Sequence, residues 1–517
     1  MPSNVTSFKP SNLKPSQAVP MVASAVGAVN SDVAKPSVTY EAGEKRRELP
    51  RTLMGGTAAM REAGDKYLPP HPVESSEAYH ARLQGAFLYN AFEMTRDAQA
   101  GKFFAEPVGL KEDVPPVIAE LCENIDGEGR ALTPFCIDLV KEAFVDGVSF
   151  VLVDFPSIAT GSTMAEQRLS GARPYWVLVK AEDVIGWRSQ DRAGKQTLTQ
   201  VRIRENVMEP DGEFGEKMVK RIREMVPGAW RLWEQLRDPT TGATKWTVVK
   251  DGATSLAYIP LVPFYTNAVG FMDGSPPLRA LAEMNQEHWI SLSEQKRALS
   301  FARFDMLVVI GGGDEGTSIT VGPNKVLGVP MGGDVKTVTQ SGAGIQAGRQ
   351  DLLDIQQRMA TAGLELRVEN AGQTTATAAA IDSDETNAGL RAVAKNLEDA
   401  LEIALQASAD YLRLPDGGSV EIADAFGGNV IPGTALEITS LNGAGLISRS
   451  TAWSELKRRH VLSEDFDPNT EQILLEDEAA QGLQRAIDQQ QAFSEANPQQ
   501  QPDNTQQPPP GGTPAAP

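Results

Sequence analysis

The chain has 517 residues, a formal net charge of −20 and only two cysteines, Cys122 and Cys136. This length predicts several domains, and the acidic balance excludes a broad basic surface that wraps nucleic acid. Two cysteines are too few for a secreted disulfide scaffold, so we expect a reducing compartment with both thiols free. No apolar run reaches the ~18 residues that a membrane-spanning helix requires.

The two ends of the chain are poor in residues that could build a core. Residues 1–44 contain recurrent Pro and Ser, and Pro20 interrupts their one apolar segment. We therefore expect a flexible N-terminal arm without a secretory signal. Residues 489–517 are rich in Gln and Pro, which predicts a disordered C-terminal tail.

The first part of the body mixes helical and strand patterns. Apolar residues recur at helical spacing in 74–101 and in 133–147, and both segments end at a glycine. β-branched and aromatic runs follow from Val148 to Asn267, bounded by Gly and Pro. The fold class predicted for this region is α+β.

Long helices dominate after Gly274. The segment SPPLRALAEMNQEHWISLSEQKRAL predicts one helix, and the segment GIQAGRQDLLDIQQRMATAGLELR predicts a second. A third helix follows the Ala/Thr-rich stretch near residue 380. The apolar stripe of the second helix comprises Leu352, Ile355, Met359 and Leu366. We expect these stripes to pack on one another or on other subunits.

Two patterns in this region imitate functional sites. Glu283, Glu287 and His288 lie close together on the first long helix, but a catalytic zinc needs about three converging ligands and the chain has only four histidines. The glycines at 311, 313 and 316 fit the spacing G-x-G-x-x-G. A strand-like segment follows them where a dinucleotide site requires a helix, so we interpret them as a turn between strands.

A third pattern, Asn124 to Gly129, copies the first half of a calcium loop. Its twelfth position is Phe135, where a bidentate Glu is required. We therefore expect a turn there. We predict no catalytic residue, no metal site and no cofactor, because neither a nucleophile elbow nor a triad is apparent.

The order of these segments resembles that of the portal proteins of tailed double-stranded DNA bacteriophages. The resemblance covers most of 65–480 and extends to local phrases, none of which is a catalytic motif. These phrases are NIDGEGRALTPF, FVDGVSFVLVDFPS, IPLVPFYT, SPPLRALAEMNQEHW, TATAAAID and AGLISRSTAWSELKRRHVLSEDFDPNTE.

The resemblance implies a portal-type multi-domain fold that assembles into a ring. The implied parts are an N-terminal arm (1–44), a wing (45–274), a first stem helix (275–306), a clip (307–344), a second stem helix (345–370), a tunnel loop (371–385), a long helix with a return to the wing (386–440), a helical crown (441–488) and the C-terminal tail (489–517).

The resemblance also implies a role and a set of partners. The ring would be a dodecamer at one capsid vertex of the virion, made in the bacterial cytoplasm, through which double-stranded DNA enters and leaves without sequence preference. Its implied partners are the terminase large subunit, which hydrolyses ATP, a major capsid or scaffolding protein, and a head–tail adaptor or tail protein. No membrane is involved.

A channel rich in Lys and Arg would hold each passing phosphate, so an acidic ring with few cations suits translocation. The candidate cations, for the channel or for intersubunit ion pairs, are Lys296, Arg297, Arg303, Arg349 and Arg358. The tunnel-loop candidates, which could make only weak, sequence-blind contacts with DNA, are Gln373, Thr374, Thr375 and Thr377. Two alternatives stay open: a nucleotide-binding enzyme that uses residues 311–316, and a non-viral helical adaptor.

Overall fold

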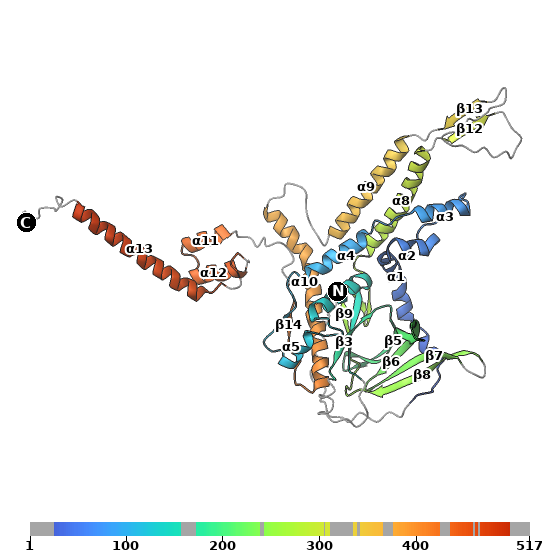
Figure 1. Cartoon of the computed structure of the whole chain (residues 1–517), viewed down its shortest axis with the longest axis horizontal. Helices are drawn as coiled ribbons and strands as arrows, with labels where there is room; N and C mark the ends of the chain where they lie inside the picture. Colours follow the sequence, from blue (N-terminus) through green and yellow to red (C-terminus); the bar gives the residue numbers. More distant parts are fainter. Residues whose placement is uncertain are drawn as a thin grey trace, which may run out of the picture. The chain divides into compact units, whose positions relative to one another are not determined.

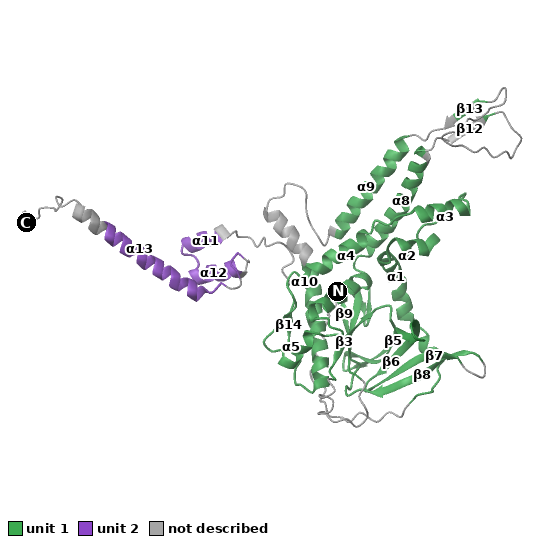
Figure 2. Cartoon of the chain, viewed as in Figure 1, with its two compact units in different colours: residues 1–427 green, residues 428–517 purple. Residues whose placement is uncertain are grey.

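The computed structural model shows helices and antiparallel sheets (Figure 1). It describes residues 25–156, 172–237, 242–303, 306–310, 334–338, 342–364, 376–423, 435–458, 461–463 and 466–496. The chain divides into two compact units, Met1–Gly427 and Gly428–Pro517 (Figure 2). The predicted α+β class is confirmed at the level of a mixed α and β structure.

Helices dominate the first part of the first unit. In chain order they are η1 (Ser31–Ala34), α1 (Val38–Met54), α2 (Gly56–Ala63), η2 (Gly64–Lys66), α3 (Ser76–Gly85), α4 (Ala91–Lys102), α5 (Pro116–Cys122) and α6 (Leu132–Asp146). The predicted helical segment 74–101 is therefore two helices. Asn90 interrupts it, because its side chain accepts a hydrogen bond from the N–H of Glu93 and caps α4.

The main core surrounds a three-stranded antiparallel sheet in the order β3 (Tyr175–Lys180), β2 (Val148–Asp154), β9 (Leu261–Tyr265). Six successive residues of the central strand β2 are buried, so both of its faces are covered. Gly147 joins α6 to β2 at φ +84°, and a Cβ there would lie 2.3 Å from the backbone of Ser275. Only glycine tolerates both the positive φ and the close backbone contact. The contact with Ser275 fixes the chain just before the first long helix.

A second sheet is a five-stranded meander. Its strands are β4 (Val184–Arg192), β5 (Lys195–Asp211), β6 (Gly215–Val226), β7 (Ala229–Arg237) and β8 (Thr244–Ala253), each paired antiparallel with the next. Beyond the pair Arg221–Glu234, residues 206–211 of β5 and 215–220 of β6 pair only with each other. They form a two-stranded ribbon with Phe214 at its tip. Four shorter strands complete the body, β1 (Gly109–Leu110), β10 (Ala268–Gly270), β11 (Asp273–Gly274) and β14 (Val420–Glu421).

The prediction of a flexible arm over 1–44 is wrong for residues 25–44. The N–H of Gly27 donates to the carbonyl of Val248, and the N–H of Val248 donates to the carbonyl of Ala28. The helix α1 begins at Val38, and the side chain of Ser37 caps it. Val33 and Tyr40 are buried against residues of the meander, among them Trp233. The surface that covers Val33 and Tyr40 belongs to a sheet distant in sequence. The two residues therefore give no local apolar pattern from which their burial could be predicted. Residues 1–24 lie outside the described part.

The predicted stem is a pair of antiparallel helices, α8 (Arg279–Arg303) and α9 (Gly342–Leu364). Between them β12 (Met306–Ile310) pairs antiparallel with β13 (Asp334–Val338), and Figure 1 shows these strands beyond the end of the helical pair. We call α8, β12, β13 and α9 the hairpin. The helix α10 (Ala376–Leu412) follows and packs against β2 and β9, and β14 pairs with β1.

The second unit contains α11 (Ala435–Gly443), α12 (Arg449–Arg458) and α13 (Pro468–Ala496). Its small core joins Ile438, Ala452 and Leu456. Two boundaries predicted from sequence need correction. The predicted crown starts at 441, inside α11, and the predicted tail starts at 489, yet α13 continues to Ala496. Residues 497–517 lie outside the described part of the chain.

Candidate functional site

The base of the hairpin is held by buried ion pairs between three elements. On α1, Arg47 donates to the carboxylate of Asp273 (2.8 Å) and to the carbonyl of Gly274, and Arg51 pairs with Asp146 at the end of α6 (2.6 Å). Arg47 and Asp146 are both almost fully buried. Because Asp273 and Gly274 lie just before α8, these contacts fix where the hairpin leaves the body.

The seam between α8 and α9 is apolar. Leu352, Ile355 and Met359 of the predicted stripe are buried, and Ile355 and Met359 belong to the same core cluster as Trp289 of α8. Leu366, the fourth residue of that stripe, lies outside the described residues. The seam therefore forms within a single chain and is continuous with the main core.

Polar contacts set the register of the two helices. The Gln295 amide of α8 donates to the carbonyl of Ile345 (2.9 Å), and Nε2 of His288 lies 3.0 Å from the amide nitrogen of Gln356. Burial lowers the pKa of His288, and the neutral imidazole can accept the amide hydrogen. An ion pair between Arg358 and Glu287 (3.0 Å) lies beside this contact.

These contacts separate the three residues that imitate a metal site. Glu283 pairs with Arg279 (2.9 Å), Glu287 with Arg358, and His288 contacts Gln356. Within the described residues, no group of three His, Cys, Asp or Glu side chains is placed to hold a metal ion. Asn124 and Asp126 accept backbone N–H groups of Gly129, Glu128 and Arg130, as in a polar turn.

The five candidate cations have different surroundings. Arg358 pairs with Glu287, and Arg297 pairs with Glu74 (2.8 Å). Lys296 is exposed, its Nζ 3.4 Å from the carbonyl oxygen of Gly85 and 5.5 Å from the ring centre of Phe87. Arg303 and Arg349 are exposed, and neither has an ion-pair partner among the described residues.

A buried carboxylate that sequence reasoning missed anchors α3 to α8. The side chain of Glu74 is 1% exposed and accepts two hydrogen bonds from Arg82, one from Arg297 and one from the N–H of His71. The hydrogen bond from Arg82 is the main cause that lowers the pKa of Glu74 to about 2. No local signal distinguishes this Glu in the sequence, because two of its partners lie 8 and 223 residues away.

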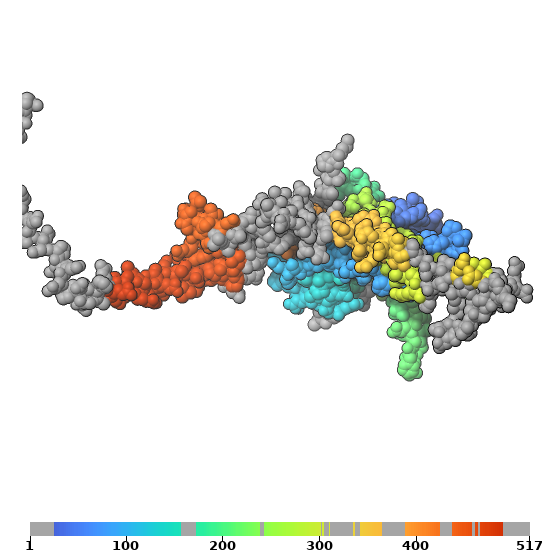
Figure 3. Space-filling view, turned by 90° about the horizontal axis from the view of Figure 1, so that it is seen from above, coloured from blue at the N-terminus to red at the C-terminus, as the bar shows by residue number. Residues whose placement is uncertain are grey.

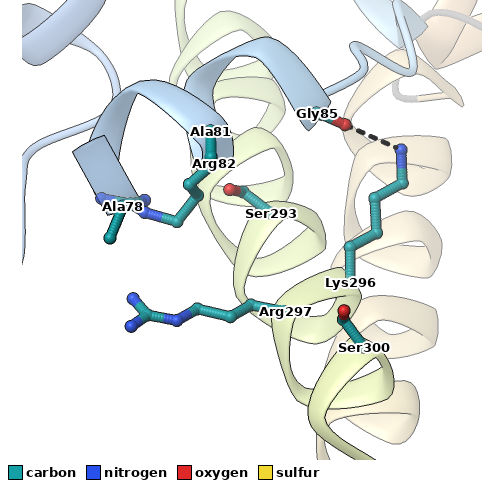
Figure 4. Close-up of a pocket in the computed structure, with 8 residues that line it drawn as sticks. All are labelled: Ala78, Ala81, Arg82, Gly85, Ser293, Lys296, Arg297 and Ser300. Atoms are coloured by element: carbon teal, nitrogen blue, oxygen red, sulfur yellow. Dashed lines mark hydrogen bonds between the residues drawn. The ribbon is translucent and has the colours of Figure 1, made fainter. Parts of the chain in front are cut away.

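Above this anchor a groove separates α3 from α8 (Figure 4). We call it the α3–α8 groove. Small residues line it from both helices, and Arg82, Lys296 and Arg297 bring positive charge to it. The small residues are Ala78, Ala81, Gly85, Ser293 and Ser300. The Oγ of Ser293 is buried without a hydrogen-bond partner, and Figure 4 shows it turned into the space between the helices.

The hairpin helices are close to electrically neutral. Together α8 and α9 carry six basic and five acidic side chains, in a chain whose formal net charge is −20. The basic residues Lys296, Arg297 and Arg303 occupy the half of α8 nearest β12, and Arg349 occupies the adjoining half of α9.

Two other predicted features lie wholly or partly outside the described residues. The glycines at 311, 313 and 316 fall between β12 and β13, in a segment that the structure does not describe. Gln373, Thr374 and Thr375 of the predicted tunnel loop also lie outside it. Thr377 falls in the first turn of α10, so the loop predicted over 371–385 is helical from Ala376 onward. The Ala-rich sequence there favours a helix.

Comparison with known proteins gives one family model and several solved structures. The model, described as a domain of unknown function (DUF4055), matches residues 277–412, from α8 through α10. No curated protein matches the chain. No helix of the described residues is long and apolar enough to cross a membrane.

Similar solved structures include chains of gene transfer agent (GTA) particles. A chain in the virion of the native GTA particle is 12% identical, with a TM-score of 0.37 over 71% of this chain and 89% of that one. A chain in the neck of the native GTA particle, computed with C12 symmetry, is 12% identical, with a TM-score of 0.37 over 77% of this chain and 98% of that one. The family description assigns no function to the chain.

Proposed function

We propose that this chain is the subunit of a portal ring, a DNA channel at one vertex of a phage capsid. The observation that carries the proposal is the order of elements: an α+β body, an antiparallel helical hairpin with paired strands at its end, and a long helix that returns to the body core. The resemblance in sequence order and local phrases supports the same function. The ring serves packaging and ejection of the genome and carries out no chemistry itself.

In this proposal each subunit contributes its hairpin to the channel wall. A wall of near-neutral helices in an acidic chain limits counterion-release affinity, so that DNA passes without being held. Arg303 and Arg349 are the candidate contacts with phosphate, because Arg297 and Arg358 already pair with carboxylates. Such contacts would be independent of DNA sequence.

The partners are assigned by part of the molecule. The hairpin end with β12 and β13 would meet the terminase large subunit during packaging and a head–tail adaptor or tail protein afterwards. The body with the two sheets would face the major capsid or scaffolding protein. The ring would be dodecameric and located in the virion, after synthesis in the bacterial cytoplasm.

The test is the assembly state of the purified full chain. Mass photometry is expected to find closed oligomers of about twelve subunits, and negative-stain images are expected to show rings with a central hole. A uniform population of monomers or dimers under all salt conditions would contradict the proposal and favour a helical adaptor. A bound nucleotide that copurifies at stoichiometric amounts would favour the enzyme alternative.

A further inference from the structure

The outer side of α9 carries a stripe of uncharged residues that the described part of the chain leaves uncovered. Successive members are three or four positions apart, so they share one side of the helix. We call this the α9 stripe; its residues are Gln346, Gln350, Leu353, Gln357 and Ala360, all exposed. Leu353 is 48% exposed, and Figure 3 shows part of α9 at the molecular surface.

The absence of charge on this stripe is informative, because both helices of the hairpin carry charges elsewhere. Uncharged side chains are far less costly to remove from water than charged ones, and charged residues are depleted at interface centres. Helical geometry places Asp354 on one flank of the stripe and Arg349 on the other. The stripe therefore has an acidic edge and a basic edge.

The α3–α8 groove offers this stripe a lining of small residues and a cation for its acidic edge. Its small residues leave room for a larger side chain. Arg82 and Arg297 pair with Glu74, whereas the described contacts of Lys296 are the carbonyl of Gly85 and the ring of Phe87, neither of which carries a net charge. Lys296 is therefore the cation best placed to pair with an incoming carboxylate.

The stripe and the groove cannot meet within one chain. His288 and Gln295 contact α9, whereas Ser293, Lys296, Arg297 and Ser300 line the groove about half a turn away around α8. Figure 1 likewise shows α3 and α9 on different sides of α8. Two unlike surfaces on different sides of one rigid element make a heterologous contact, which generates a closed ring when the rotation closes.

We propose that the α9 stripe of one subunit lies in the α3–α8 groove of the next, with Leu353 against the small residues of the groove and Asp354 beside Lys296. The inference rests on the proposed ring, and it names the surface through which adjacent hairpins join.

The experiment introduces the double change Ala81→Cys and Leu353→Cys into the full chain. Both positions are exposed, and the native Cys122 and Cys136 are buried, so that mild oxidation reaches only the new pair. We expect a ladder of covalent multimers on a non-reducing gel, up to the full ring. A mixture of the two single variants should stop at covalent dimers, because each subunit then offers only one reactive position.

The matched control is Ala81→Cys with Asp351→Cys, which moves the second cysteine about half a turn around α9 and should give no ladder. A charge exchange adds an independent measurement. Lys296→Glu should weaken association about fivefold per contact, as for an exposed ion pair turned into repulsion, and Asp354→Lys should restore it. Lys111→Glu, an equal charge change on an exposed loop, should have little effect.

The outcomes separate this inference from the proposed function. Rings that form normally but give neither the ladder nor the charge rescue would show that the neighbouring hairpins join through other surfaces, while the ring itself stands. A chain that forms no ring under any condition would overturn both.

Discussion

Glu74 shows how a single carboxylate holds two helices together. Its side chain is buried, and the Arg82 guanidinium that pairs with it is also buried, with Arg297 as a further donor. Replacing Glu74 with Gln would leave Arg82 without a counter-charge in the interior. We expect the free energy of unfolding to fall by about 3 kcal/mol, the usual cost of breaking a buried pair. Thermal denaturation measures this, and Glu77→Gln, on the exposed first turn of α3, should change it little.

The same residue predicts a pH dependence. The pKa of Glu74 is lowered to about 2 in the folded chain, so its contribution to stability is present above the pKa of the unfolded chain and is lost as the pH falls toward 2. The difference in melting temperature between the parent protein and Glu74→Gln should be constant from pH 7 to 5 and should shrink below pH 4. A difference that grows on acidification would contradict this assignment.

Gly147 permits a direct test of close backbone approach. Alanine there would combine a positive φ with a Cβ only 2.3 Å from the Ser275 backbone, whereas Gly129 has a φ of +100° and open space around it. We expect Gly129→Ala to cost about 1 kcal/mol for the backbone conformation alone. Gly147→Ala should cost at least 3 kcal/mol, because strain from the clash adds to that cost. Chemical denaturation of the two variants side by side measures the difference.

At the scale of elements, two nearby positions of α9 differ in burial. Ile355 is fully buried, and Leu353 is 48% exposed. An aspartate at position 355 would place an unpaired carboxylate in the core, at a cost of about 4 kcal/mol. We expect Ile355→Asp to lower the melting temperature strongly and to prevent rings, whereas Leu353→Asp should keep the parent melting temperature and weaken assembly alone. Circular dichroism beside mass photometry separates the two effects. Rings of normal stability from Ile355→Asp would mean that this face is exposed.

The success of prediction from sequence also differed by element. The two helices of the hairpin could be located within several residues of their ends, because their apolar residues recur with one period over about four turns or more. Residues 25–44 and the break at Asn90 could not, since the first depends on a distant sheet and the second on one capping side chain. The candidate cations were found by residue type, but Glu74, Arg82 and Ser293 became visible only when α3 was placed against α8.

At the scale of the whole molecule, the last helix contributes little to the core of its own unit. From Asn469 to Gln489 nearly every side chain of α13 is exposed, and the small core of the second unit is supplied by α11 and α12. We therefore expect that ending the chain at Asp488 changes neither the melting temperature nor ring formation. Light scattering of the shortened protein measures assembly, and a product that stays monomeric would show that the tail joins subunits.

The proposed role as a passive channel predicts no turnover of ATP by the isolated ring. Packaging energy would then come from the terminase, and ATP hydrolysis should appear only when that partner is added. A phosphate-release assay on the purified ring, with and without the terminase, measures this. Sustained hydrolysis by the ring alone, retained after further purification, would favour the enzyme alternative.

The ribbon formed by β5 and β6 beyond the meander determines where we expect a protease to cut the protein first. Its two strands lack outer neighbours over 206–211 and 215–220, so they open at less cost than the sheet from which they extend. At its tip Phe214 is 91% exposed between Glu213 and Gly215. Chymotrypsin should therefore cut first after Phe214, and the two fragments should remain associated through the paired strands on either side of the nick. Amide hydrogens of the ribbon should exchange with deuterium before those of β2.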